Sequence, residues 1–169
     1  MTPAHGVSRD PDASRVLVAL RVPATPERAF ATFTDRIDDW WVHNELFQFI
    51  RGRTGTMVFE TGPSGRLLER YDDGTEFVIG EVRAWAPPHG FVIGWRQAGF
   101  ETGQDTELHV SFAAVQADPP STRVTVQHFG WDAIPPENAA RHGFPLPVFS
   151  LRFAQWWRDH LAALAALAG

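Results

Sequence analysis

Three titratable side chains stand on predicted strands, where the alternation of faces decides what they can do. His128 shares a face with Val124 and Val126, so we expect it to point into the protein. A buried imidazole there can anchor a ligand or transfer a proton. The same alternation groups Glu60 and Glu81 with apolar neighbours, and a carboxylate drawn into a cavity can act as an acid or base. The alternatives are a hydrogen-bonded core histidine and two carboxylates at an exposed rim.

Aromatic residues are the unusual part of the composition. Seven Trp and 13 Phe stand beside a single Tyr in 169 residues. Near the C-terminus, Phe153, Trp156 and Trp157 fall on one stripe of a predicted helix. Such rings either fill the space against a sheet or form the wall of a ligand cavity. A buried indole N–H also needs an acceptor, for which Gln97, Glu60 and His128 are candidates.

The elements that position these residues follow from periodicity and turn signals. Thr25 and Pro26 begin a short helix, and Asp35 caps a second one. An apolar stripe predicts a long helix over about 148–168. The links between successive later strands are short, which favours antiparallel neighbours. A period of two predicts strands at about 16–22, 56–61, 66–71, 76–85, 91–96, 106–115 and 123–129.

Several segments, in this order, resemble one known family. They are Thr25-Pro26-Glu27-Arg28-Ala29-Phe30, Phe33-Thr34-Asp35, Trp40-Trp41, Asp73-Gly74, Gly80-Glu81-Val82, Ala86-Pro87-Pro88, Ile93-Gly94-Trp95 and Thr122 to Trp131. The chain is similar to the START-like, helix-grip superfamily (SRPBCC), within it to the group of the activator of Hsp90 ATPase. The resemblance implies an α+β helix-grip fold: a curved seven-stranded antiparallel sheet around a long C-terminal helix, with two short helices after the first strand. It implies one domain over 15–169, after a flexible tail at 1–14.

A fold of this kind tends to leave a cavity between helix and sheet, and function must be argued from that site. We expect an apolar or aromatic small molecule to bind there. One alternative is a protein-interaction role, as a co-chaperone or stress-response partner, through an exposed sheet face or the segment 135–147. Another is an enzyme resembling polyketide cyclases and dehydratases, with a buried His or Glu. The predicted cavity residues are Trp40, Trp41, Glu60, Glu81, Trp95, Phe112, His128, Phe153, Trp156 and Trp157.

Composition excludes several other classes. The net charge is −5, and the 15 Lys and Arg residues are scattered, which argues against nucleic acid as a partner. No apolar run approaches the roughly 20 residues that span a bilayer. There is no cysteine, and His43 and Glu45 lack further ligands at metal-site spacing, so we expect no metal and no cofactor. The sequence favours a cytoplasmic monomer or homodimer.

Overall fold

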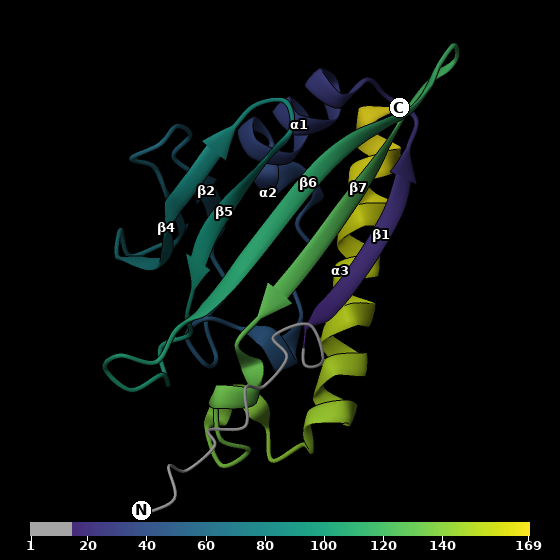
Figure 1. The fold of residues 1–169 in the computed structure, drawn as a ribbon. Helices are drawn as coiled ribbons and strands as arrows, with labels where there is room; N and C mark the ends of the chain where they lie inside the picture. The colour runs from purple at the N-terminus through teal and green to yellow at the C-terminus, as the bar shows by residue number, and fades with distance from the viewer. Residues whose placement is uncertain (1–14) are drawn as a thin grey trace, which may run out of the picture.

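The computed structural model describes residues 15–169, and the predicted tail at 1–14 lies outside the described residues. One sheet runs in the order β1-β7-β6-β5-β4-β3-β2, with every neighbouring pair antiparallel (Figure 1). Its strands are β1 (Val16–Val22), β2 (Thr56–Phe59), β3 (Arg66–Arg70), β4 (Glu76–Ala86), β5 (Gly90–Trp95), β6 (Thr106–Ala117) and β7 (Pro120–Phe129). The helices are α1 (Pro26–Asp35), α2 (Ile37–Trp40) and α3 (Leu146–Ala168), with 3-10 turns η2 (Glu45–Phe47), η3 (Trp131–Ala133) and η4 (Ala139–Arg141).

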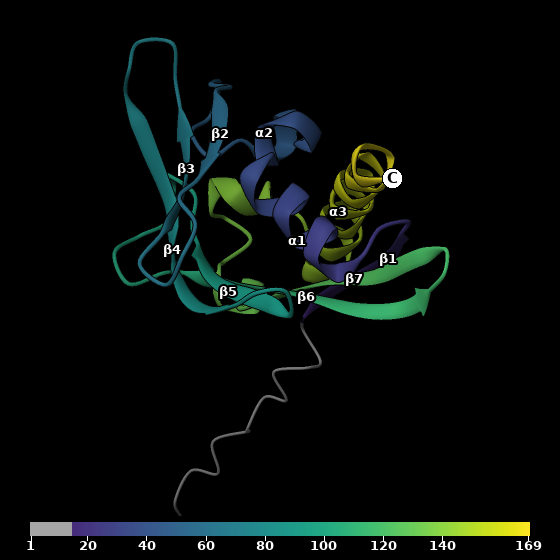
Figure 2. The same ribbon diagram turned by 90° about the horizontal axis from the view of Figure 1, so that it is seen from above.

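The sheet curls around the helices, as the helix-grip fold requires. Figure 2 shows β2, β3 and β4 standing as a wall beside a floor of β5, β6, β7 and β1, with α1, α2 and α3 inside the curl. The long helix buries one broad stripe against the sheet, including Phe149, Phe153, Trp157 and Leu164. The predicted fold class is therefore confirmed.

Irregularities in β4 produce part of the curl. Register shifts occur between Leu67 and Leu68 in the β3–β4 pair and between Val82 and Ala84 in the β4–β5 pair. Bulges of this type bend a strand and increase its twist. Gly80 passes so close to β5 that a Cβ atom there would lie 1.6 Å from the carbonyl oxygen of Gly94. Only glycine permits that approach.

Several element boundaries differ by one to three residues from those predicted, and two of them involve prolines. The long helix begins at Leu146, two residues early, with Pro147 in its first turn. Proline is tolerated there because the first amides of a helix have no intrahelical acceptor. The strand β7 begins at Pro120, so it forms a longer hairpin with β6 than the turn residues suggested.

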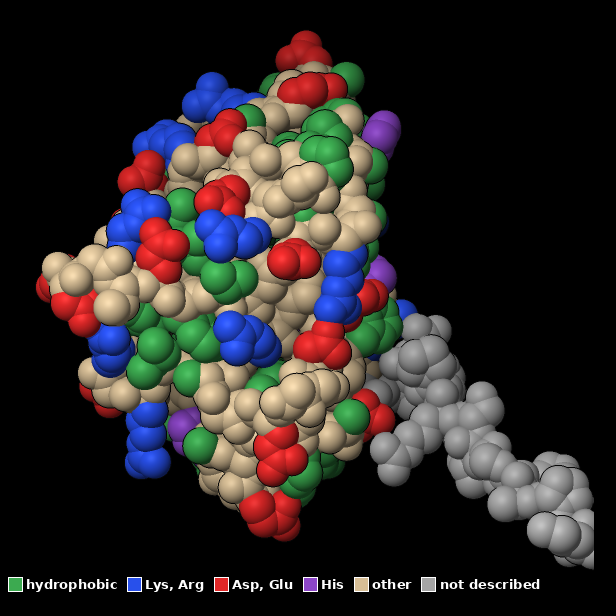
Figure 3. Space-filling view, turned by 90° about the vertical axis from the view of Figure 1, so that its left-hand side faces the viewer, with side chains coloured by type: hydrophobic (Ala, Val, Ile, Leu, Met, Phe, Trp, Pro, Cys, Tyr) green, Lys and Arg blue, Asp and Glu red, His purple; other side chains and the backbone are tan. Residues whose placement is uncertain are grey.

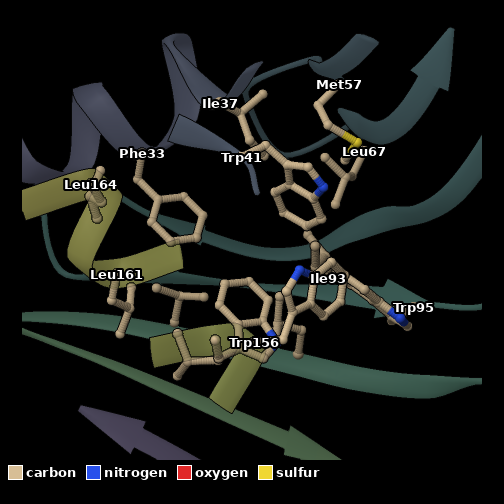
Figure 4. Close-up of a cluster of buried hydrophobic side chains, with 14 of the residues drawn as sticks. Phe33, Ile37, Trp41, Met57, Leu67, Ile93, Trp95, Trp156, Leu161 and Leu164 are labelled. Atoms are coloured by element: carbon tan, nitrogen blue, oxygen red, sulfur yellow. The ribbon is translucent and has the colours of Figure 1, made fainter. Parts of the chain in front are cut away.

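Aromatic rings occupy the space between α3 and the sheet. Trp41 follows α2, Trp95 ends β5, and Trp156 projects from α3, so three parts of the chain meet in one cluster (Figure 4). The centroids of the Trp41 and Trp95 rings lie 6.2 Å apart, and those of Trp41 and Trp156 lie 5.4 Å apart. Trp157 is fully buried beside them. Of the two uses foreseen for these rings, filling the interior is the one observed.

The outer surface carries charges of both signs. Figure 3 shows basic and acidic side chains interspersed on the face that it presents. Typical pairs are Arg66 with Glu60, at 2.6 Å, and Arg83 with Glu107, at 2.7 Å. Within residues 15–169, no helix combines the length and the apolar character needed to cross a membrane.

Candidate ligand site

Eight of the ten predicted cavity residues are buried, on α3, on the inner face of the sheet or just after α1. His128 and Trp95 face Phe153 of α3, with ring centroids 5.0 and 6.4 Å away. Phe112 lies on β6, beneath α1, where its ring contacts Phe33. The eight are Trp40, Trp41, Trp95, Phe112, His128, Phe153, Trp156 and Trp157.

His128 is held as a neutral core residue. The hydroxyl of Thr106 donates to the carbonyl of Trp95 at 2.9 Å, so it must accept a hydrogen from His128 Nε2 at 2.6 Å. Complete burial, and to a lesser degree His109, lowers the pKa of His128 to about 3. An imidazole in this setting stays uncharged near neutral pH. Its hydrogen bond to Thr106 joins β7 to the start of β6.

Glu60 and Glu81 are exposed and line no interior cavity, which agrees with the alternative of two carboxylates at an exposed rim; only Glu81 lies on another face than its predicted neighbours. The buried face of β2 is formed by Met57 and Phe59, and Glu60 instead accepts from Arg66 at the exposed end of the hairpin. That guanidinium lowers the pKa of Glu60. In β4 the alternation breaks after Ile79, so Val82 is buried while Glu81 is exposed. The register shifts on both sides of this segment account for the change of face.

A pocket of about 310 Å³ opens at the end of the curl where η2, η4 and the chain after β5 meet. We call it the mouth pocket. This volume lies at the lower end of the range typical of small-molecule sites. Apolar side chains and a few polar groups line it: Glu45, Leu46, Gln48, Phe49, Arg51, Gln97, Ala98, Gly99, Ala139, Ala140 and His142.

Two asparagines position the segments around the mouth pocket. Asn44 caps η2 by accepting from the amide of Leu46 at 2.8 Å, and Asn138 caps η4 by accepting from Ala140 at 3.0 Å. The Asn138 side chain also donates to the carbonyl of Gly99 at 2.9 Å, which ties η4 to the chain after β5. These bonds hold separate parts of the sequence around one space.

The segment 135–147, considered as a partner-binding surface, forms part of this pocket. The guanidinium of Arg141 is buried and donates to the carbonyls of Ile134 and Phe144, at 2.7 and 2.8 Å. His142 adopts a left-handed conformation, with φ of 52°, and its Nε2 bonds the carbonyl of Leu46. The segment is therefore anchored at η2, and Arg141 also lies over the Phe149 ring of α3, 5.3 Å from its centroid, so the segment closes one side of the mouth pocket.

Gln97 gives the mouth pocket its distinctive polar group. Its side chain is only 4% exposed, yet its Nε2 has no hydrogen-bond partner among the described residues. A buried amide hydrogen without an acceptor costs free energy. A ligand acceptor that pairs with it removes this cost, which makes the free energy of binding more favourable. The sequence suggested Gln97 only as a partner for an indole, because it follows a strand and belongs to no periodic pattern.

A second polar group escaped the sequence reasoning altogether. Glu69 on β3 is buried, and the hydroxyl of Tyr71 donates to it at 2.6 Å. Burial, followed by this contact with Glu69, raises the pKa of Tyr71. The signal was present in the alternation of Leu67, Glu69 and Tyr71, which puts all three on the inner face. Over residues 15–169, no three His, Asp or Glu side chains gather as a metal site requires.

Comparison with known proteins places the chain in a family. The model of the Activator of Hsp90 ATPase homolog 1-like protein family matches residues 23–169. The chain belongs to this family. The match covers all the helices and all but the first strand of the helix-grip fold, in agreement with the resemblance stated from the sequence. The comparison with curated proteins returned no match.

Solved structures of family-like proteins agree on the fold. The anthrahydroquino-gama-pyrone synthase Txn09, complexed with SUM, is 27% identical over 90% of this chain and 95% of its own, with a TM-score of 0.53. An HSP90 activator from Plasmodium falciparum is 19% identical over 74% of this chain and 76% of its own, with a TM-score of 0.50. A protein from Mesorhizobium loti is 16% identical, covers 90% and 95%, and has a TM-score of 0.61.

Proposed function

We propose that this protein binds a planar aromatic small molecule that carries a hydrogen-bond acceptor, and that it does so in the mouth pocket. The observation that carries the proposal is the buried amide of Gln97, unpaired among the described residues, in a pocket of about 310 Å³. Phe49 and Leu46 supply apolar wall, and the amide selects for a carbonyl or similar acceptor.

The position of the ligand differs from the one expected from the sequence. Between the middle of α3 and the sheet, the rings of Trp95, Phe153 and Trp157 already pack against one another. A ligand there would have to displace buried aromatic surface, whereas the mouth pocket accepts one without repacking. The 27% identity to a synthase of a fused aromatic pyrone supports an aromatic ligand for this chain as well.

The experiment is calorimetric titration with 1-tetralone, a bicyclic aromatic ketone. Ala98 is exposed and lines the pocket, so Ala98→Trp fills the space without disturbing the interior. We expect this variant to bind 1-tetralone at least about 10-fold more weakly than the parent protein. Ala113→Trp, on the exposed face of β6, is the matched control and should bind normally.

Two results would contradict the proposal. One is an absence of binding by the parent protein at millimolar 1-tetralone. The other is equal weakening in Ala98→Trp and Ala113→Trp, since the effect would then come from the added indole and not from its position in the pocket.

A further inference from the structure

The buried carboxylate of Glu69 has no evident structural counter-charge. Its side chain is 3% exposed, and its one recorded hydrogen bond comes from the Tyr71 hydroxyl at 2.6 Å. Among residues 15–169, no Arg or His forms an ion pair with it. Buried carboxylates are normally paired or fully hydrogen-bonded because desolvating the charge is costly. Glu69 therefore retains capacity to accept a proton or a further hydrogen bond.

This carboxylate faces a small recess beside the mouth pocket. The recess holds about 10 Å³, enough for one water-sized group. Gln48 and Phe49 line both spaces, so movement of the Phe49 ring would join them. The recess is walled by Trp41, Phe47, Phe49 and Trp156, and by Arg53 and Glu69 as its charged members.

Arg53 contributes a positive charge to the recess. Its guanidinium carbon lies 4.1 Å from the centroid of the Tyr71 ring, and its Nη2 donates to Asp73 at 2.9 Å. Tyr71 thus contacts both charged groups, because the guanidinium lies over its ring and its hydroxyl donates to the carboxylate. A proton acceptor and a fixed positive charge line the same recess, together with polar side chains such as His43 and Asn44, and this arrangement can form and stabilise an oxyanion.

We propose that Glu69 is a general base for an aromatic ketone whose ring system lies in the mouth pocket, an inference that rests on the proposed function. The Glu69 carboxylate takes a proton from the carbon next to the ketone. The electron pair of that C–H bond forms the enolate double bond, and the carbonyl π pair moves to oxygen. The Gln97 amide, which donates to that oxygen in the proposed complex, and the nearby positive charge of Arg53 stabilise the resulting oxyanion. Glu69 then returns a proton to the same carbon, so the enolisation consumes no other reactant.

The test is the exchange of hydrogen for deuterium at carbon 2 of 1-tetralone in D₂O, followed by proton NMR. We expect the protein to accelerate exchange over buffer, and Glu69→Gln to lose at least about 100-fold of that acceleration. Glutamine keeps the volume of the side chain and can still accept from Tyr71, so calorimetric binding of 1-tetralone should not change. Glu101→Gln, on an exposed loop, is the matched control and should exchange like the parent protein.

The outcomes separate this inference from the proposed function. One contradicting result is that 1-tetralone binds but exchanges its hydrogen no faster than in buffer, and another is that Glu69→Gln supports exchange at the parental rate. In either case Glu69 is not the general base, and the binding proposal stands. If 1-tetralone does not bind the parent protein, both fail. Should Glu69→Gln not fold, Glu69→Asp retracts the carboxylate by one methylene and must slow exchange without abolishing binding.

Discussion

The interior under α3 and the mouth of the curl are built from similar aromatic residues but differ in the open space that they enclose. Under α3, fully buried rings pack against one another, although His128 Nδ1 and Trp157 Nε1 have no hydrogen-bond partner among the described residues. At the mouth, Gln97 also has an unpaired amide nitrogen, but it lines a pocket of about 310 Å³, and Glu69 in the neighbouring recess forms no ion pair with the described residues. We therefore expect the first region to contribute most of the stability and the second region to bind the proposed ligand.

The largest expected effect is a loss of stability when a large side chain is removed from the interior. Trp157→Ala removes a fully buried indole from the face of α3 and should lower the free energy of unfolding by about 3–5 kcal/mol. Urea denaturation measures this change. Leu151→Ala, on the same helix but 68% exposed, should stay within about 0.5 kcal/mol of the parent protein. Equal effects of the two changes would contradict the assignment of the core to this face.

Lowering the pH should also destabilise the protein, through the buried histidines of the interior. Burial lowers the pKa of His128 to about 3 and that of His160 well below its usual range. Below about pH 6.5 the unfolded chain binds these protons and the folded chain does not, so stability falls as the pH falls. The free energy of unfolding should decrease by about 1.4 kcal/mol per pH unit for each histidine between pH 6 and 5. His128→Gln should remove about half of this slope, and a stability that is flat from pH 7 to 5 would contradict the account.

The smallest effect concerns the mouth alone. Gln97→Met preserves most of the side-chain volume but removes the amide hydrogens, so 1-tetralone should bind about 3- to 10-fold more weakly. Tetralin, the same ring system without the carbonyl, should bind the two proteins alike. Titration calorimetry on both ligands gives the comparison. A similar loss for tetralin would mean that Gln97 contributes packing and no hydrogen bond.

The two regions were also unequally predictable from the sequence. Phe153, Trp156 and Trp157 recur at helical spacing and His128 alternates with valines, so periodicity alone placed them in the interior. Glu81 was misplaced because the register shifts in β4 reverse its face, and no local residue pattern announces a bulge.

The mouth was the harder region to foresee. Gln97 and His142 lie in irregular segments, where long-range bonds such as that from Asn138 to Gly99 decide the geometry. Glu69 was within reach of the alternation rule, but its neighbour Leu68 is also buried, and the pattern of the strand is therefore blurred.

Where 1-tetralone contacts the protein tests the central claim most directly. Intermolecular NOEs can be measured between the ligand and protein methyl groups, which are present in both regions. We predict NOEs to the methyl groups of Ala98, Ala139 and Ala140, which line the mouth pocket. NOEs to Leu161 and Leu164, buried under α3, without contacts to those alanines would place the ligand between helix and sheet and contradict the account.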